Sequence, residues 1–599
     1  MTSAGSRRSR DRHSPAEQRL IDSVARGDVL DLAGDEPVDE AAMRSWGDDR
    51  TISASVIRDL VRGRLAAEPD PHGLRLRGAR ITGRIDLANI TSDLVLELGD
   101  CLLPDGLDLR NARLPAVALT GCRIEQTAGS GDAPVDATRL TARVLSFDSS
   151  TILATAAAGA IRLAAARIGT VDSRGARLGN TGGPALEAGG LHADHSVFLS
   201  DGFDATSTSE QGTVRLIGAH IGGQLNCGGA ALRNTTGPAL NADGLSVAQG
   251  VLLQRGFTAT STSEQGTIRL IGAATSALHC AGARLENTAG PALDGDNLQV
   301  KRDIGLDRGF IATGVSDEGA VVLTGAHVGG LLDCSAARMA NTGGPALHAN
   351  GLRVDQDLIL DDGFSAATAG CPVTLTLAGA RVGGTFRFDS EVVTQAEADH
   401  GSLVEVDGLT YSGLPGPASV QRWLTVLGKH TARYAAQPYQ HLAAAYRAAG
   451  HDRDARTVLV AQRRDQLDRG GLTGPERAWG RLTGLTLGYG YQPWRALLLL
   501  IATLAAAVAL SVAGGHHGAL AQKATVGTAS AGPCTITDQI GVGLDLGTPL
   551  IKTGARDRCQ PTSTSAGQAL TLTGWVLQLV AWGFATLFIA GFTSAVRKT

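Results

Sequence analysis

The sequence predicts a mainly β protein: a parallel, right-handed β-helix solenoid with an N-terminal helical cap, a C-terminal helical hairpin and two transmembrane helices. Three observations lead to this fold class. A unit of about 54 residues recurs along the middle of the chain, short apolar-x-apolar pairs precede it, and two long apolar runs lie near the C-terminus. Self-similarity at a fixed period is typical of a stacked architecture in which each unit contacts only its neighbours.

Length and composition agree with a solenoid. A chain of 599 residues exceeds what one compact core covers, so several domains or a repeat stack are expected. Its 78 glycines and its aromatic content of 4% suit a narrow, tightly turning fold better than an ordinary globule. The net charge of -4 is spread along the chain, so no nucleic acid is expected among the partners.

The chain begins with a basic, polar segment, residues 1–14, which we predict to be a disordered tail. No apolar run follows it, so it is not a secretory signal. Ser14, Pro15 and Glu17 are typical of a helix start, with the serine as the cap. Apolar residues at helical spacing follow, so residues 15–67 are predicted to form a helical cap that covers the exposed end of the repeat stack.

Over residues 72–412 the pattern changes to short pairs such as Leu74-Arg-Leu76, in which two apolar residues flank one other residue. Each pair indicates a short strand with both apolar side chains on one face. Equivalent positions return at a short, nearly constant step, as Leu76, Leu98 and Leu119 do. This spacing predicts a parallel β-helix of about 22 residues per turn and some fourteen turns, with glycines at its corners.

The repeat is clearest over residues 167–388. The motif Asn-Thr-x-Gly-Pro-Ala-Leu begins at four positions that lie 54, 53 and 54 residues apart: Asn180, Asn234, Asn287 and Asn341. A Gly-Phe pair keeps the same step. Each unit holds short strands and one polar excursion, so we predict two turns per unit, one of them with a long loop. The asparagines are predicted to occupy turn positions, because asparagine tolerates the left-handed region and bonds its own backbone.

Five cysteines fall at repeated positions: Cys101 and Cys122 lie one turn apart, and Cys227, Cys280 and Cys334 keep the step of the larger unit. The sequence contains no Cys-x-x-Cys, so neither a thioredoxin-type pair nor a zinc knuckle is indicated. Cysteine is a small apolar residue that is often fully buried. We therefore predict a structural ladder in the interior and no metal site.

Repeated positions that could carry chemistry change from unit to unit. His220 and His327 match, but the same position holds Arg167, Ala274 and Arg381 in the other units. A polysaccharide lyase or hydrolase would need carboxylates and bases clustered on one face, and the sequence assembles no such cluster. Gly-Gly pairs lie within the strand pattern and not between a strand and a helix, so no nucleotide cofactor is predicted. The catalytic residues, if any exist, stay unknown.

After the solenoid the period becomes helical, and residues 416–485 are predicted to form a helical hairpin module. Residues 438–450 are typical of one helix ended by a glycine, and residues 452–464 are typical of its partner. The pair resembles a single tetratricopeptide-like hairpin, and two helices are too few for a solenoid of their own. We expect this module to serve as a stalk or as a docking site.

Two apolar runs, residues 494–513 and 572–592, are predicted to be transmembrane helices, because each reaches the roughly 17–25 residues needed to span a bilayer. Arginines precede the first run, and Arg597 and Lys598 lie in the short tail of residues 593–599. By the positive-inside rule both termini face the cytoplasm. The chain is therefore predicted to be a plasma-membrane protein with two spans and a cytoplasmic solenoid.

Residues 514–571 connect the two runs and are predicted to form an extracytoplasmic loop. This loop holds Cys534 and Cys559, the two cysteines on the oxidising side, and we predict that they form a disulfide. For an oligomeric pore, the stretch from Asp538 to Asp545 is the candidate to dip back into the bilayer, although no potassium-type filter sequence is present.

The repeat resembles that of a known family. The matching residues are Gly325-Ala-His-Val-Gly-Gly-Leu331, Gly379-Ala-Arg-Val-Gly-Gly-Thr-Phe386 and, downstream, Gly488-Tyr-Gly-Tyr-Gln-Pro-Trp494. They are similar to a family of actinobacterial membrane proteins that are related in style to pentapeptide-repeat proteins, many of which are labelled membrane-associated oxidoreductase. The resemblance covers most of the chain and implies the architecture given above. It implies an oxidoreductase activity by label only, with no catalytic residue or cofactor to carry over.

The leading hypothesis is a non-enzymatic, membrane-anchored β-helical scaffold that presents a repetitive surface to partners in the cytoplasm. The expected partners are the lipid bilayer and either another protein or a second copy of the chain, and no cofactor is expected. Two alternatives stay open: a membrane-associated oxidoreductase, and an oligomeric pore built on the two spans. The sequence leaves enzymatic activity undecided and favours its absence.

Overall fold

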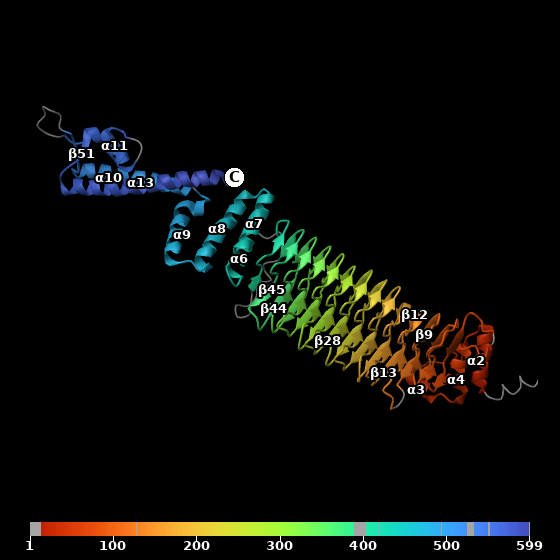
Figure 1. Cartoon of the computed structure of the whole chain (residues 1–599). Coiled ribbons are helices and arrows are strands. Elements are labelled where there is room, and N and C mark those ends of the chain that lie inside the picture. The colour runs from red at the N-terminus through yellow and green to blue at the C-terminus, as the bar shows by residue number, and fades with distance from the viewer. Residues whose placement is uncertain are drawn as a thin grey trace, which may run out of the picture. The chain divides into compact units, whose positions relative to one another are not determined.

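The computed structural model describes residues 13–36, 38–66, 68–126, 129–388, 403–416, 419–492, 494–523, 532–548 and 552–597. The chain divides into two compact units, Met1–His441 and Leu442–Thr599, each of which is described by itself (Figure 1). Of the predicted tails, residues 1–12 and residues 598–599 lie outside the described residues.

The first unit is a parallel β-solenoid of about thirteen turns. Each short strand pairs in parallel with the equivalent strands of the neighbouring turns, so the strands form rows of stacked arrows (Figure 1). Within the described ranges these rows make three sheets, of which sheet 2 and sheet 3 each hold thirteen strands. Sheet 1 holds 23, because most turns contribute two strands to it. The predicted parallel solenoid is confirmed, with about thirteen turns where fourteen were predicted.

The bounds of the strands show how short each one is. Sheet 1 consists of β1 (Leu30–Asp31), β3 (Leu74–Arg77), β6 (Leu96–Gly99), β9 (Ala116–Thr120), β12 (Thr141–Ser146), β15 (Arg167–Asp172), β18 (His192–Ala193), β19 (Val197–Phe198), β22 (His220–Ile221), β23 (Gln224–Asn226), β26 (Ser246–Val247), β27 (Gly250–Leu252), β30 (Ala274–Thr275), β31 (Leu278–His279), β34 (Gln299–Val300), β35 (Ile304–Gly305), β38 (His327–Val328), β39 (Leu332–Asp333), β42 (Arg353–Val354), β43 (Leu358–Leu360), β46 (Arg381–Val382), β47 (Phe386–Phe388) and β49 (Thr410–Tyr411). Sheet 2 consists of β2 (Thr51–Ser53), β4 (Arg80–Thr82), β7 (Leu102–Leu103), β10 (Arg123–Glu125), β13 (Thr151–Ala154), β16 (Arg177–Asn180), β20 (Asp204–Ser207), β24 (Ala231–Asn234), β28 (Thr258–Ser261), β32 (Arg284–Asn287), β36 (Ile311–Gly314), β40 (Arg338–Asn341) and β44 (Ser365–Thr368). Sheet 3 consists of β5 (Ile85–Asp86), β8 (Leu107–Asp108), β11 (Val135–Asp136), β14 (Ile161–Arg162), β17 (Leu186–Glu187), β21 (Val214–Arg215), β25 (Leu240–Asn241), β29 (Ile268–Arg269), β33 (Leu293–Asp294), β37 (Val321–Val322), β41 (Leu347–His348), β45 (Val373–Thr376) and β48 (Leu403–Glu405).

The length of a turn changes along the solenoid. Leu98 pairs with Leu76 and with Leu119, so the first turns have the short length that the sequence spacing predicts. Ser207 pairs with Asn180 and with Asn234, which lie further from it in the chain, so these later turns are longer. The prediction of two turns per repeat unit is therefore confirmed, but the long loop is not confined to one of them, because the two turns have equal length. Two of the longer turns make one repeat unit, from Asn180 to Asn234.

Large and small side chains alternate from turn to turn in the interior. The four phenylalanines of the Gly-Phe pairs are buried, and each follows a buried alanine at the same position of the preceding turn. The four pairs are Ala176 and Phe203, Ala230 and Phe257, Ala283 and Phe310, and Ala337 and Phe364. Because interiors pack densely, a small residue leaves room for the large one stacked on it. This alternation explains why the sequence repeats every two turns.

The N-terminal segment contains α2 (Pro15–Arg26), α3 (Glu40–Ser45), the 3-10 helix η1 (Asp48–Arg50) and α4 (Ala54–Val61). Ser14 caps α2: its side chain accepts from the Glu17 backbone N–H, and the Glu17 carboxylate accepts from the Ser14 backbone N–H. The same segment also supplies β1 and β2, which pair with β3 and β4. Residues 15–67 are therefore not purely helical, because their strands satisfy the backbone groups of the first full turn.

The C-terminal part of the first unit contains α6 (Val420–Lys429) and the start of α7 (Ala436–Ala448). The indole of Trp423 lies against the rings of Phe386 and Phe388, with both centroid distances 5.8 Å. Its Nε1 donates a hydrogen bond to the backbone oxygen of Pro415 at 3.1 Å. Helix α6 thereby covers aromatic side chains of the last turns.

The second unit is helical apart from one short hairpin of strands. Its elements after α7 are α8 (Asp452–Arg469), α9 (Gly474–Leu487), the 3-10 helix η2 (Gly488–Gly490), α10 (Trp494–His516), β50 (Leu520–Gln522), α11 (Ile536–Gly547), α12 (Ala555–Arg558), β51 (Cys559–Pro561) and α13 (Ser565–Arg597). The predicted hairpin corresponds to α7 and α8, and α6 and α9 are additional helices in residues 416–485. Among the residues that the structure describes, two helices are long and apolar enough to cross a membrane, over Trp494–His516 and Ser565–Ala590.

Candidate functional site

The four repeated asparagines lie buried at the ends of β16, β24, β32 and β40. The Nδ2 group of Asn180 donates to the Pro184 oxygen at 2.7 Å and to the Ala156 oxygen of the preceding turn at 2.8 Å. Its Oδ1 accepts from the Gly182 N–H at 3.1 Å. The other three asparagines make equivalent bonds to a proline oxygen and to the preceding turn: Asn234, Asn287 and Asn341. These bonds tie each Gly-Pro turn to the turn beneath it.

The left-handed corners of the solenoid lie at other residues. The residue before each Gly-Phe pair has a positive φ: 54° at Asp201, 56° at Arg255, 52° at Arg308 and 48° at Asp362. The repeated asparagines are not among the residues with a positive φ. The predicted reason for them is therefore wrong in part. Asparagine is needed at these sites because its amide both donates and accepts, and not because of its φ.

The cysteines of the larger unit are buried, free thiols. Cys227, Cys280 and Cys334 are all 0% exposed. Leu253 and Leu306 occupy the same position in the intervening turns, so successive cysteines lie two strands, or about 9–10 Å, apart. The column therefore alternates cysteine with leucine. Burial raises the pKa of Cys227 to about 12, which keeps the thiol protonated and unreactive.

Cys101 and Cys122 are also buried, and they do lie in adjacent turns, next to the paired residues Leu102 and Arg123. The Cys122 thiol donates to the Leu98 oxygen at 3.1 Å. Burial, and then the neighbouring Cys101, raise the pKa of Cys122. None of these five thiols has the electropositive, exposed surroundings that a reactive cysteine needs.

The outer face of sheet 3 carries charges that are paired across turns. The guanidinium of Arg215 donates from Nη1 to both carboxylate oxygens of Glu187 in the preceding turn, at 2.8 Å each. Arg269 likewise pairs with Asp243 at 2.6 Å. The Glu187 side chain is 11% exposed and that of Arg215 is 30% exposed, so the pair lies largely between turns. Such cross-strand pairs hold neighbouring turns together.

The outer face of sheet 1 carries a different column, in which each residue is the register partner of the next. In chain order its members are Thr91, Arg113, Thr141, Arg167, His192, His220, Ser246, Ala274, Gln299, His327, Arg353, Arg381 and Thr410. Seven of these thirteen described positions are arginine or histidine, and none is aspartate or glutamate. We call this set the basic column. A comparison of sequence positions one whole repeat unit apart does not find this column. That step covers two turns and therefore skips every second member of the column.

One end of the basic column lines a groove of about 1220 Å³ on the outside of the solenoid. Arg113, Arg143 and Arg167 line it from three successive turns, and His192 and His195 line it from the next. All five side chains are exposed.

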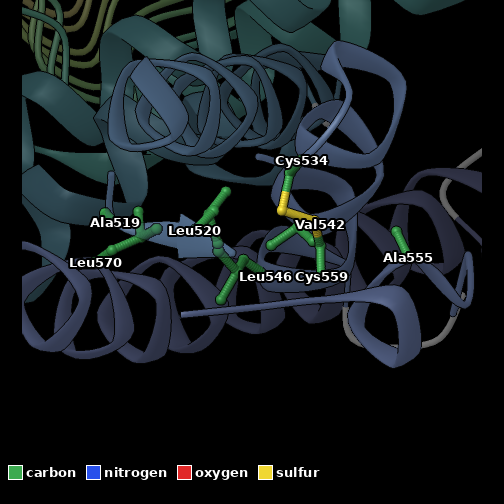
Figure 2. Close-up of a cluster of buried hydrophobic side chains, with 8 residues drawn as sticks. All are labelled: Ala519, Leu520, Cys534, Val542, Leu546, Ala555, Cys559 and Leu570. Carbon is green, nitrogen blue, oxygen red and sulfur yellow. A yellow bond between two sulfur atoms is a disulfide. The ribbon is translucent and has the colours of Figure 1, made fainter. Parts of the chain in front are cut away.

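The second unit holds a compact core around the predicted disulfide partners. Cys534 and Cys559 are joined by a disulfide, with their Cα atoms 6.2 Å apart, among small and apolar side chains (Figure 2). The strands β50 and β51 pair antiparallel beside it. The Ser511 hydroxyl of α10 donates to the Gln539 backbone oxygen of α11 at 2.7 Å. The described part of the connection between the two long helices, residues 517–523, 532–548 and 552–564, is thus folded around the disulfide.

Helix α11 lies close against α10 through its glycines. A side-chain carbon at Gly543 would lie 2.5 Å from the Val508 Cα, and one at Gly547 would lie 2.8 Å from a methyl group of Leu504. Val508 and Leu504 belong to the apolar run that was predicted to span the membrane. Helix α11 therefore packs at the level of that run, and its own Gln539 side chain is buried there.

Helix α9 exposes an apolar face. Trp479 is 64% exposed, Leu482 is 50% exposed and Leu485 is 72% exposed, at a regular spacing that places them along one side. Arg477 and Arg481 on the same helix are also exposed. This arrangement of an apolar stripe with arginines is typical of a helix at a membrane surface.

Within the described ranges, no group of three or more histidine, cysteine, aspartate or glutamate side chains is placed to hold a metal ion. No family model, curated protein or solved structure matches the chain. The candidate site is therefore defined by this chain's own geometry, and we take the groove at the end of the basic column as that candidate site.

Proposed function

We propose that the protein is a non-enzymatic, membrane-anchored scaffold whose solenoid presents its outer faces to partners in the cytoplasm. One observation carries this proposal: the side chains that repeat with the unit face the interior or close the turns, whereas the outer positions vary. A repeat with that distribution is selected for stacking, and its binding capacity lies in surfaces that extend over several turns.

The anchor consists of α10 and α13 as two spans of the plasma membrane, with both termini in the cytoplasm. Their length and apolar composition support this role, as do Arg495 before the first span and Arg597 after the second. Helix α9 directly precedes α10 and adds an interfacial contact, in which Trp479 enters the headgroup region. The disulfide of the connecting segment fits the oxidising side of the membrane.

Protease protection of the full chain tests the proposal. In sealed inverted membrane vesicles, whose cytoplasmic face is outward, added protease should remove the solenoid and leave a fragment that begins near α10. In right-side-out vesicles the solenoid should survive. Solenoid cleavage in right-side-out vesicles, or release of the intact chain by carbonate washing, would overturn the arrangement. Capture of proteins and small molecules on the anchored chain, followed by mass spectrometry, then identifies what the scaffold binds.

The close packing of α11 supports a second candidate function, an oligomeric pore. If α10 and α13 span the bilayer, α11 re-enters it from the outer side, and buried Gln539 and Asp545 lie at that level. Polar groups at such a depth mark ion or substrate paths. Ion flux through liposomes that contain the purified chain, lost when Gln539→Leu is introduced, would support the pore, and tight liposomes would exclude it.

Two features of the fold belong to the same proposal. The helices α2, α3 and α4 act as a cap for the first full turn, a role supported by the ion pair between Arg58 of α4 and Asp86 of β5. The solenoid winds in the right-handed sense, as nearly all parallel strand connections do. The oxidoreductase activity implied by the resemblance stays a prediction, which a bound chromophore or nucleotide in the purified protein would support.

A further inference from the structure

The arginines at the groove differ from those on sheet 3 in having no partners. Neither Arg113, Arg143 nor Arg167 makes a side-chain hydrogen bond or an ion pair with any residue that the structure describes. On sheet 3 the charges of Arg215 and Arg269 are neutralised by ion pairs with acidic side chains of the preceding turn. A guanidinium carries five donors and keeps its positive charge, so three exposed guanidinium groups on adjacent turns can exchange their water for the anionic acceptors of a partner.

The floor of the groove is backbone at Gly169, which lies between Arg143 and His195 in the stacking order. A side-chain carbon at Gly169 would collide with the Arg143 carbonyl oxygen, so the stacking of these two turns requires glycine at this point of the groove. Strands lie about 4.8 Å apart, which places Arg113 and Arg167, two turns from each other, about 10 Å apart along the groove. Several acceptors on one extended chain can therefore reach all three arginines together.

The groove also contains features that argue against a dense polyanion. Asp93 and Asp194 line it, and Asp194 lies 3.5 Å from the Nε2 of His192. Nearby Pro115 and the 39%-exposed Val144 add apolar surface. A continuous row of phosphates would meet both carboxylates and gain nothing from the apolar patch, because like charges repel and apolar contact requires an apolar partner.

We propose that this groove binds an extended acidic segment of a partner protein, in which carboxylates alternate with apolar side chains. In an extended strand successive side chains point to opposite sides, and every second one points the same way about 6.8 Å apart. A segment that lies edge-on in the groove therefore turns its glutamates toward the arginines and its apolar side chains toward Pro115 and Val144. Bidentate guanidinium–carboxylate contacts orient the segment, and the groove floor accepts its backbone. The inference rests on the proposed scaffold function, of which it names the class of partner.

The test uses the full chain in a neutral detergent and a fluorescent eight-residue peptide of alternating glutamate and leucine, with binding followed by fluorescence anisotropy. The triple variant Arg113→Gln, Arg143→Gln, Arg167→Gln should weaken binding about tenfold, as expected for three exposed pairs. The matched control Arg177→Gln, Arg255→Gln, Arg338→Gln removes the same charge from exposed arginines elsewhere on the solenoid and should change binding less than twofold. Replacement of the groove arginines by lysine should restore part of the affinity.

Three outcomes would overturn the inference. Equal weakening by both triple variants would mean that only net charge matters. If a glutamine–leucine peptide bound as tightly as the glutamate–leucine peptide, the groove would not be recognising carboxylates. Tighter binding of inorganic polyphosphate or single-stranded DNA than of the acidic peptide would assign the groove to a polyanion. Membrane anchoring, measured by protease protection, is unaffected in each case, so failure here is separate from failure of the scaffold proposal.

Discussion

Sheet 3 and sheet 1 share one backbone geometry, since every full turn of the solenoid contributes strands to both, yet the charged residues of their outer columns are paired differently. On sheet 3 arginine follows an acid in successive turns, as in Glu187 and Arg215. On sheet 1 Arg167 is followed by His192 and then by His220, whose rings stack at 5.0 Å. The charges on the outer face of sheet 3 are therefore paired with one another, whereas those on the outer face of sheet 1 are exposed to solvent or to a partner.

The difference shows that a charged residue on a solenoid has to be interpreted by its register partner. A pair one strand apart is held at a fixed short distance by the ladder, so its loss is felt in stability. An unpaired charge on the same ladder contributes little to stability and much to steering and binding. The predictions below test this division, beginning with the largest expected effect.

Breaking the sheet 3 pair should destabilise the protein most. Glu187→Gln leaves the Arg215 guanidinium largely between turns without its carboxylate, and the expected loss in the free energy of unfolding is about 3 kcal/mol. Denaturant unfolding of the full chain in detergent measures it. Arg233→Gln, which removes an arginine from an exposed pair with Asp204 on sheet 2, is the control and should cost below about 1 kcal/mol. Equal losses for the two variants would contradict the division.

The sequence was sufficient to predict the solenoid and its two-turn unit, because the apolar-x-apolar pattern and the period are local properties of the chain. Leu76, Leu98 and Leu119 could be aligned by counting alone, and the structure pairs them. The alternation of Ala230 with Phe257 could not be seen in this way, because it depends on a register of half a repeat unit that crosses loops of unequal length.

The candidate site was missed for the same reason. Arg167 and His220 were compared one whole unit apart, which made the position look variable, whereas His192 between them completes a basic column. Comparison at half the period would have found it. Periodicity in the sequence could not predict the strands β1 and β2 or the packing of α11, because each is determined by contacts with segments distant in the chain.

Within sheet 3, Asp294 breaks the pairing rule and should titrate accordingly. Its register partner Arg269 bonds to Asp243 instead, and burial raises the pKa of Asp294 to about 6. Because this pKa exceeds the unfolded value near 4, the folded state holds the proton more tightly, and stability is lost as the pH rises from about 4 through 6. Asp294→Asn should therefore raise the free energy of unfolding at pH 7 by about 2 kcal/mol.

The same variant carries its own control in the pH profile. Below pH 4 both proteins have a neutral side chain at position 294, so their unfolding free energies should converge there. The amide can still accept the bond that Asp294 receives from the Asp296 N–H. A constant difference at every pH would show that the carboxylate is not the titrating group.

The smallest effect should come from the basic column and should have the opposite sign. Arg167 is exposed, has no acidic partner in the described part of the chain, and lies one strand from His192 and two from Arg113. The guanidinium charges of Arg113 and Arg167, two strands or about 10 Å apart, repel weakly in water. Arg167→Gln should therefore raise the free energy of unfolding by about 0.3 kcal/mol at low ionic strength. The gain should vanish in about 0.5 M salt, where the Debye length is only about 4 Å. Thermal unfolding at the two salt concentrations measures the change, with Arg215→Gln on sheet 3 as the comparison.

The Arg215→Gln variant should be destabilised at both salt concentrations, since the Arg215–Glu187 pair is partly buried and poorly screened. A loss of stability in Arg167→Gln would mean that sheet 1 also relies on its arginines for stacking, and would remove the physical basis for treating them as free to bind.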